Sequence, residues 1–276
     1  MIAVAKRLLR PWVERIPTVA RTYRSLRDRR DLHRPAHATP YGFRFVGNPM
    51  FVDGRYEPAE TAKAQELFRK CDVFVNVGAN QGYYCCLAGS HGVATIAIEP
   101  DPLNLQYLLT NITENRLEQR IEVFPLAASS EPGILRLYGT AAGASLVEGW
   151  SGSASANSKL VPVNTLDNII GDRLSGRRCF VLIDIEGHEF PVLQGAQKLL
   201  DQQPRPVWII EIQVHGHQPS GRVINPQLRS TFEMFWSRGY ESWTVEDKPR
   251  PVLPDLIRRI ESEGDDLLGV YNFLFA

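Results

Sequence analysis

A glycine-rich turn follows the first buried strand that the sequence predicts. The apolar run 73–77 leads into residues 77–82, which read VGANQG, and a plausible helix follows. A strand, a glycine-rich turn and a helix form the first unit of nucleotide-binding α/β domains, because glycine lets the backbone turn sharply and lets a ligand approach it. A turn that binds a pyrophosphate has a second glycine where this chain has Asn80. The turn therefore predicts a site for S-adenosylmethionine (SAM), which carries adenosine but no phosphate. A plain strand-to-helix turn is the alternative.

A carboxylate ends the second predicted strand, residues 94–98. Glu99 lies 21 residues after Gly78, close to the spacing at which nucleotide-binding domains place an acid on the ribose. At the tip of that strand its carboxylate can accept hydrogen bonds from both ribose hydroxyls. The alternative is that Glu99 only caps the helix that begins near Leu103. The turn and the spacing together favour the ribose role.

Acidic residues and a histidine follow the fourth predicted strand, residues 179–185. Residues 183–189 read IDIEGHE, and in an open α/β sheet ligands lie beyond the carboxyl ends of the strands. Asp184 is therefore a candidate for the residue nearest the reacting group, and His188 is a candidate general base. Glu189 has a simpler interpretation, because an acid in the first turn of a helix interacts favourably with the helix dipole.

The fifth predicted strand, residues 206–212, carries another acid and is followed by two histidines. Glu211 is expected at the same rim as Asp184, and His215 is a second candidate for the general base. Asp184 and Glu211 are also candidate ligands of a divalent metal. For His215 and His217 the alternative is a pair of solvent-exposed side chains.

The composition is that of an ordinary globular protein. The chain has 276 residues, of which 43% are hydrophobic and 22% charged, and its formal net charge is zero. This balance gives no indication of a nucleic-acid partner. The four cysteines include no C-x-x-C pair, so neither a zinc site nor a disulfide framework is indicated. No apolar stretch approaches the ~20 residues of a membrane span. We expect a cytoplasmic protein, and its oligomeric state stays open.

The N-terminal segment departs from this balance. Residues 1–34 hold ten Lys or Arg against three acids, with apolar residues interleaved. Such a basic amphipathic segment can lie on an anionic membrane surface, here the inner face of the membrane. Packing on the core or on a second subunit is the alternative. We expect a basic helical extension over 1–40 and a single domain over 41–276.

Alternating strands and helices fill that domain. Besides the four strands above, the pattern predicts strands over 121–124, 240–245 and 270–275, and helices over 57–70, 82–90, 102–115, 189–200, 226–238 and 254–261. This order predicts an α/β, Rossmann-like fold with a seven-stranded, mostly parallel sheet, an antiparallel last strand and helices on both faces. Two hairpins are also predicted, one over 41–57 around Asp53 and Gly54, and one inserted over 129–163 with a long loop.

Taken together, the motifs resemble the FkbM family of SAM-dependent methyltransferases. The resemblance extends from about Tyr56 to about Tyr240, and the order and spacing of the motifs are more specific than any one of them. The motifs are YEP (56–58), NVGANQG (76–82), EPDP (99–102) with Asn111, VNTLD (163–167), IDIEGHE (183–189), LQGA (193–196) and residues 206–211. The resemblance implies a class I methyltransferase fold, SAM as cofactor, and methyl transfer to a hydroxyl of a sugar, glycan or glycolipid, or of a polyketide-like natural product.

The predicted cofactor contacts follow from the turn and from this resemblance. They are Asn76, Gly78, Ala79, Asn80, Gly82, Glu99 and Pro100, with Ala127 and Ala128 beside the adenine. Two positions depart from the family pattern. Asn76 stands where relatives usually have an aspartate that orients the methionine end of SAM, and Leu182 stands where they often have a lysine. Asn76 leaves open a degenerate module that binds SAM and a partner without catalysis. A nucleotide-dependent oxidoreductase and a nucleic-acid methyltransferase are disfavoured, because the motifs of both are missing.

Overall fold

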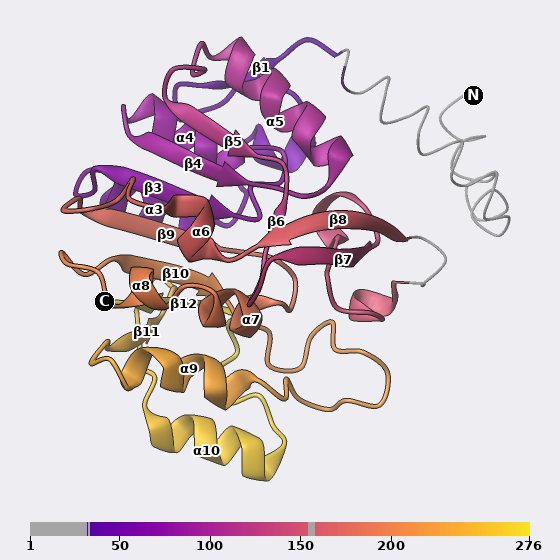
Figure 1. Ribbon diagram of the computed structural model, residues 1–276, viewed down its shortest axis with the longest axis vertical. Helices are drawn as coiled ribbons and strands as arrows, with labels where there is room; N and C mark the ends of the chain where they lie inside the picture. Colours follow the sequence, from indigo (N-terminus) through magenta and orange to yellow (C-terminus); the bar gives the residue numbers. More distant parts are fainter. Residues whose placement is uncertain (1–31, 33, 154–157) are drawn as a thin grey trace, which may run out of the picture.

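The computed structural model of the protein describes residue 32 and residues 34–153 and 158–276. A seven-stranded sheet runs through its centre, formed by β3 (Val73–Val77), β4 (Ala94–Ile98), β5 (Ile121–Phe124), β9 (Cys179–Ile183), β10 (Val207–Glu211), β11 (Ser242–Thr244) and β12 (Asn272–Phe275). The order across the sheet is β11-β12-β10-β9-β3-β4-β5 (Figure 1). β12 runs antiparallel to both of its neighbours, and the other neighbouring pairs are parallel. The predicted seven-stranded sheet with an antiparallel last strand is therefore confirmed.

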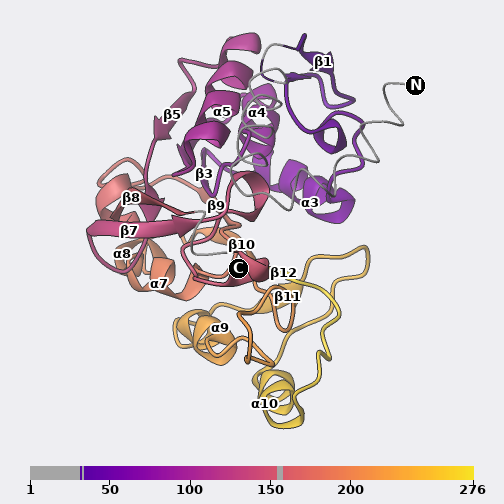
Figure 2. The same cartoon turned by 90° about the vertical axis from the view of Figure 1, so that its right-hand side faces the viewer.

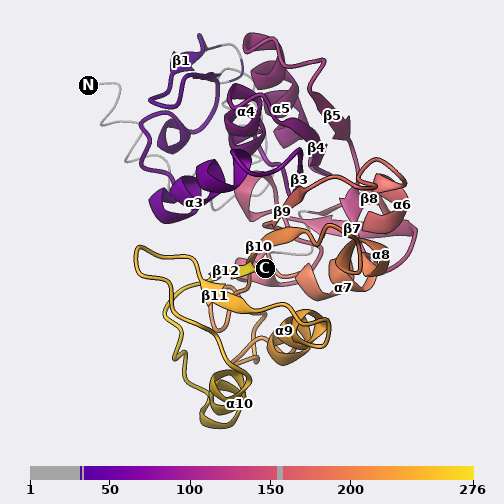
Figure 3. The same cartoon turned by 90° about the vertical axis from the view of Figure 1, so that its left-hand side faces the viewer.

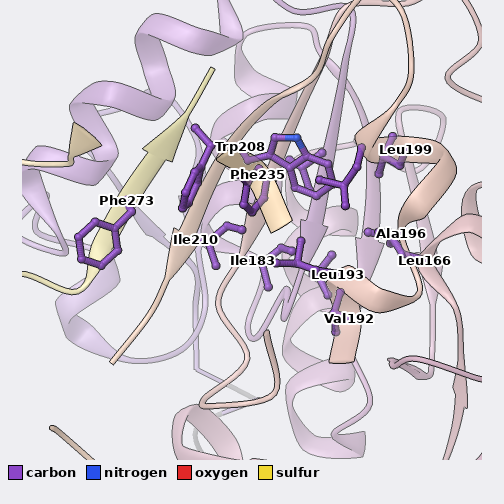
Figure 4. Close-up of a cluster of buried hydrophobic side chains, with 14 of the residues drawn as sticks. Leu166, Ile183, Val192, Leu193, Ala196, Leu199, Trp208, Ile210, Phe235 and Phe273 are labelled. Carbon is purple, nitrogen blue, oxygen red and sulfur yellow. The ribbon is translucent and has the colours of Figure 1, made fainter. Parts of the chain in front are cut away.

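Helices cover both faces of the sheet, because the side chains of each strand alternate between two cores. In β3, Val75 and Val77 lie in one core and Phe74 lies in the other. The first core, part of which Figure 4 shows, is completed by α6 (Leu166–Ile170), α7 (Glu189–Gln194), α8 (Gln197–Leu200), α9 (Leu228–Trp236) and α10 (Pro254–Glu263). The second core is completed by α3 (Pro58–Phe68), α4 (Tyr83–Ser90) and α5 (Pro102–Glu114). In all three views α10 lies beyond α9, at the opposite end of the molecule from α5 (Figures 1, 2 and 3).

A second, smaller sheet interrupts the alternation of strands and helices. Its strands are β6 (Ala127–Ala128), β7 (Gly133–Tyr138) and β8 (Ser158–Asn164), in the order β6-β8-β7. β7 and β8 pair antiparallel in the segment where the inserted hairpin was predicted, and the short β6 adds a parallel pair with β8. Figure 1 shows this sheet beyond the carboxyl ends of the parallel strands, where ligands of α/β domains bind. The described residues also form three 3-10 helices: η1 (Pro49–Phe51), η2 (Ala141–Gly143) and η3 (Trp150–Gly152).

The first hairpin lies upstream of its predicted position. It consists of β1 (His37–Ala38) and β2 (Arg44–Phe45), whereas the predicted turn at residues 53–54 follows η1 and connects no strands. The turn closes at Thr39, because both its backbone N–H and its hydroxyl donate to the carbonyl of Phe43, at 2.9 and 2.8 Å. A side-chain hydrogen bond of this kind fixes a turn that the Asp-Gly pair alone did not identify.

The helix predicted over 189–200 is divided into α7 and α8. Asp167, in the first turn of α6, makes this break. Its backbone N–H donates to the carbonyl of Gly195 at 2.9 Å. Its carboxylate accepts from the N–H groups of Lys198 (2.9 Å) and Leu199 (3.1 Å) and so caps α8. A residue distant in sequence therefore starts a new helix where the apolar pattern predicts one continuous helix.

The predicted basic extension over 1–40 lies mostly outside the described residues, and so does the predicted membrane contact of residues 1–34. Within the part of the chain that the structure describes, no helix is both long and apolar enough to cross a membrane.

Candidate active site

A cavity of about 380 Å³ lies at the carboxyl ends of β3, β4, β9 and β10. The chain order reverses there, between β3 and β9, which is the position where open α/β sheets bind ligands. One wall is formed by β7 of the small sheet and by the segment that follows β7, through Leu137, Ala141, Ala144 and Leu146. We call the part around Asn80, Glu99 and Asn104 the β4 end, and the part around Glu57, Asp184, Glu186 and Glu211 the β9–β10 end.

The turn after β3 joins the two ends. Gly78 and Ala79 donate their backbone N–H groups to the carbonyl of Ile98, at 2.9 and 3.0 Å. Gly78 has φ +86°, and a Cβ added to it would lie 1.8 Å from the backbone carbonyl oxygen of Asp184. The turn needs glycine here because the turns after β3 and β9 pack backbone to backbone. The sequence predicts a ligand beside this glycine, which does line the cavity, and the structure adds that another strand end packs against it.

Glu99 dominates the β4 end and is 4% exposed. One carboxylate oxygen accepts from the backbone N–H of Asn80 at 2.7 Å, and the other accepts from the backbone N–H of Asp101 at 2.8 Å. Burial raises its pKa to about 7, although these hydrogen bonds oppose the shift. The Asn104 amide also donates to the oxygen that accepts from Asp101, so the oxygen that accepts from Asn80 keeps one lone pair for a hydroxyl donor on the cavity side.

Asn104, in the first turn of α5, belongs to the same end and was not predicted. Its side-chain amide donates to Glu99 at 3.2 Å and to the carbonyl of Ala141 at 3.4 Å. Its carbonyl oxygen Oδ1 is buried without a partner, and the residue lines the cavity. Asp101 begins α5 by accepting from Leu103 and Asn104, and it forms an ion pair with Lys159 of β8. The sequence could have indicated Asn104 by its position, five residues after Glu99 and in the first turn of the helix that follows.

The predicted cofactor residues divide into two groups. Gly78, Asn80, Glu99, Pro100, Ala127 and Ala128 line the main cavity. Asn76 and Ala79 instead line a separate cavity of about 20 Å³ behind the turn, which has room for about one water. Asn76 is 2% exposed, donates to the sulfur of Cys85 at 3.4 Å, and leaves its own Oδ1 without a partner. Gly82 is the N-cap of α4, faces Leu108 of α5, and lines neither cavity.

Two carboxyl groups meet at the β9–β10 end. Asp184 directly follows β9, and Glu211 is the last residue of the neighbouring parallel strand β10. Their side chains are hydrogen-bonded to each other. Burial and the nearby Glu211 raise the pKa of Asp184, and burial raises the pKa of Glu211 to about 7. Gln213 also donates to Glu211, at 2.5 Å. Two buried carboxyl groups so close together oppose each other's ionisation, so the pair favours a state that holds a proton.

This arrangement does not support the predicted divalent metal. No group of three or more His, Cys, Asp or Glu side chains in the described ranges is arranged to hold a metal ion. Asp184 and Glu211 contact each other and offer two carboxyl groups, whereas a hard cation such as Mg²⁺ or Ca²⁺ needs about six oxygens.

Glu57 was not among the predicted site residues, although it lies in the YEP motif. It precedes α3 in a left-handed conformation (φ 39°) and lines the cavity. Its carboxylate accepts from the hydroxyl of Tyr84 at 2.8 Å. Burial and the nearby Asp184 raise the pKa of Glu57 to about 8. The sequence order did not indicate Glu57 as a site residue, because α3 precedes the sheet in the chain. Only the tertiary structure brings Glu57 close to the end of β9.

The three histidines that follow β9 and β10 have different positions relative to the cavity. His188 lines the cavity, its Nε2 lies 3.0 Å from the hydroxyl oxygen of Ser129, and burial lowers its pKa to about 4. His215 does not line the cavity, and its buried Nε2 has no partner. His217 lines the cavity in its place, with Nδ1 3.3 Å from the carboxylate of Glu186. Of the two candidate bases, the structure therefore brings only His188 to the site.

The segment between β7 and β8 is fastened to the turn after β9. Trp150 donates its indole N–H to the carboxylate of Glu186 at 2.7 Å, and Ser145 donates its hydroxyl to the backbone carbonyl of Glu186 at 2.6 Å. Gly187 (φ +98°) lies flat against the Trp150 ring, which a Cβ would meet at 2.4 Å. Glu189, from the same turn, is 4% exposed, accepts from the Gly187 N–H at 2.8 Å, and does not line the cavity.

The comparisons with known proteins identify a family. The methyltransferase FkbM domain matches residues 76–242, which include Glu99, Asp184, Glu186 and Glu211 but not Glu57. A comparison with curated proteins finds no match.

Among solved structures, the fold is similar to methyltransferase FkbM from Methylobacillus flagellatus KT, at 18% identity and a TM-score of 0.45. That alignment covers 84% of this chain and 56% of the other, so this chain spans little more than half the length of that relative. It is also similar to an O-methyltransferase from Bacillus cereus in complex with SAH, at 15% identity and a TM-score of 0.45, covering 79% and 80% of the two chains. The domain match extends over more than half of the chain, and the protein therefore belongs to the FkbM family of SAM-dependent methyltransferases.

Proposed function

We propose that this protein transfers the methyl group of SAM to a hydroxyl group of a sugar or glycan. The observation that carries the proposal is the placement of two kinds of carboxyl group in one cavity. Glu99, held by backbone donors, lies at the β4 end, and the hydrogen-bonded pair of Asp184 and Glu211 lies at the β9–β10 end. The first suits a ribose diol, and the second suits removal of a hydroxyl proton.

The cofactor would be held at the β4 end. Glu99 is placed to accept from the ribose hydroxyls, and Ala127 and Ala128 offer small apolar side chains to the adenine. The unpartnered Oδ1 of Asn104 supplies one more acceptor on this side. Gly78 lies where the turn reaches Asp184, so the reactive end of the cofactor is expected between the two ends of the cavity. When bound, SAM supplies a methyl group activated on a sulfonium.

The Asp184 and Glu211 pair would act as the general base. With one proton shared between two carboxyl groups, the pair keeps one negative charge near neutral pH and can accept the proton of an attacking hydroxyl. A sugar hydroxyl is only weakly acidic, so methylation at oxygen needs such a group within reach. His188 is the weaker candidate, because burial lowers its pKa to about 4 and the neutral imidazole is then a poor proton acceptor.

Tyr271 supports a sugar as the acceptor. Its side chain lines the cavity and is 45% exposed, although it is an aromatic residue. An exposed ring beside carboxyl groups offers an apolar face to the C–H side of a sugar ring while polar groups bind the hydroxyls. A flat apolar acceptor such as a polyketide would leave the surrounding carboxyl groups without hydrogen-bond partners.

The test is the Asp184→Asn variant, assayed by mass spectrometry for transfer of a deuterated methyl group from SAM to a panel of methyl glycosides. We expect methyl transfer to fall at least ~100-fold, the usual loss for a general base, while calorimetry shows SAM affinity within about threefold of the wild type. Glu189→Gln is the matched control, because it alters a buried carboxyl of the same turn that does not face the cavity.

Two outcomes would contradict the proposal. Full activity of Asp184→Asn would remove the carboxyl pair from catalysis. Tight SAM binding without turnover of any glycoside would point to a polyketide-like acceptor or to a module that binds SAM without catalysis.

A further inference from the structure

The β9–β10 end of the cavity is acidic, and none of the described residues that line it is a lysine or an arginine. Glu57, Asp184, Glu186 and Glu211 all line it. Within the described ranges, no Lys or Arg side chain lines any part of this cavity. Lys159, from the wall formed by the small sheet, is bound to the buried Asp101 and is not among the lining residues.

The hydrogen-bond partners of these acids are not Lys or Arg. Glu57 accepts from the Tyr84 hydroxyl, Glu186 from the Trp150 indole and Glu211 from the Gln213 amide. A hydroxyl, an indole and an amide orient a carboxyl group without adding a positive charge beside it, whereas an arginine would add one.

The effect of burial on these acids agrees with this description. The pKa of Glu57 is raised to about 8 and that of Glu211 to about 7, in both cases chiefly by burial. An adjacent lysine or arginine would lower these values instead. Groups with such pKa values hold protons near neutral pH, and a ligand that brings positive charge favours their ionised form, whereas a ligand that brings negative charge opposes it. The cavity therefore has a chemical reason to prefer the first kind of ligand and to reject the second.

We propose that this end of the cavity selects the acceptor sugar by charge: it accepts neutral sugars and amino sugars, and it rejects sugars that carry a carboxylate, sulfate or phosphate. The inference rests on the proposed function and narrows its substrate class. It excludes uronic acids, sugar phosphates and nucleotide-linked sugars as acceptors, because each would place an anion among four acidic side chains with no lysine or arginine beside them.

Glu186 is the residue through which this selection can be changed. Its carboxylate is in hydrogen-bond contact with the side chains of Trp150 and His217. Glu186 is part of neither the proposed general base nor the proposed cofactor contacts. Glu186→Gln keeps an oxygen that can accept from the Trp150 indole while removing one negative charge. The exposed Glu131 lies outside the cavity, so Glu131→Gln is the control for a change in net charge alone.

The experiment compares three acceptors with the same ring: methyl glucoside, methyl glucosaminide and methyl glucuronide. Methyl transfer is measured at saturating SAM, and binding of each glycoside is measured in the presence of S-adenosylhomocysteine, which separates recognition from catalysis. We expect the glucuronide to be at least tenfold poorer than the glucoside by both measures, and the glucosaminide to be at least as good as the glucoside. In Glu186→Gln the ratio of glucuronide to glucoside should rise at least threefold, and in Glu131→Gln it should not change.

The outcomes separate this inference from the proposed function. If the glucuronide is bound and methylated as well as the glucoside, selection by charge is wrong while sugar methylation stands. If SAM binds but none of the three glycosides binds or reacts, the sugar acceptor is wrong, and the charge selection built on it is overturned with it.

Discussion

The two ends of the cavity use the same chemical group in different ways. At the β4 end, Glu99 accepts from two backbone N–H groups, those of Asn80 and Asp101, so its position is set by the main chain. At the β9–β10 end, Asp184 and Glu211 are positioned by each other and by side chains. A carboxylate fixed by backbone donors is rigid and suited to binding, whereas a pair that shares a proton is suited to accepting one.

This difference separates affinity from turnover. Changes at the β4 end should alter how tightly SAM is held, and changes at the β9–β10 end should alter how fast a methyl group is transferred. The Asp184→Asn and Glu186→Gln experiments address the second end. Three further predictions address the junction of the two ends, the first end and the charges that both share.

The largest effect is expected where the two ends touch. Gly78→Ala would add a Cβ 1.8 Å from the Asp184 carbonyl oxygen, in a backbone that cannot move without separating β3 from β9. We expect the free energy of unfolding to fall by more than ~3 kcal/mol, measured by urea denaturation. Gly92→Ala is the matched control: Gly92 has a similar φ of +78° with nothing within 4 Å of an added Cβ, so it should cost only ~1 kcal/mol. Equal losses in the two variants would show that backbone conformation, not the contact, makes Gly78 necessary.

The next effect concerns affinity. Glu99→Gln keeps a side chain of the same shape but loses the charge that the ribose hydroxyls would contact. The loss of one charge-assisted hydrogen bond, worth ~1.5 kcal/mol or more, predicts that SAM affinity falls at least about tenfold, measured by calorimetry. The exposed Glu131→Gln should bind SAM like the wild type. A Glu99→Gln variant that binds SAM normally would contradict the ribose role.

The smallest effect is the dependence of both ends on pH. Burial raises the pKa of Glu99 and Glu211 to about 7 and that of Glu57 to about 8, above the value of 4.5 expected in the unfolded chain. The folded protein then binds more protons than the unfolded chain between about pH 4.5 and 8. Its stability without ligand should therefore fall as pH rises through this window.

The cofactor should reverse this trend. A sulfonium favours ionised carboxyl groups, so SAM affinity should rise about tenfold from pH 6 to pH 8, with release of protons on binding. S-adenosylhomocysteine, whose sulfur is neutral, should show a smaller rise. Calorimetry in two buffers of different ionisation enthalpy measures both quantities, and equal pH profiles for the two ligands would contradict an effect of charge.

The parts of the fold that follow from local pattern could be predicted. The strands over 73–77, 94–98 and 121–124 have the predicted bounds, because a buried parallel strand is a short apolar run that ends at a turn. The bounds of α7 and α8 could not be predicted, since the break depends on Asp167 from another helix. The first hairpin was misplaced because Asp53-Gly54 is a strong turn signal, whereas Thr39 closes the actual turn through a side-chain contact.

The sequence by itself determined the sheet, the glycine turn, and the placement of Glu99, Asp184 and Glu211 at the carboxyl ends of strands. These features depend on residues close together in the chain and on the topology of parallel sheets. Only the tertiary structure decided that Asp184 meets Glu211, and that Trp150 fastens Glu186 from 36 residues away. It also decided that His217 lines the cavity where His215 does not. The physical reason is that burial and side-chain hydrogen bonds depend on which distant segments pack together, and no periodicity along the chain records that.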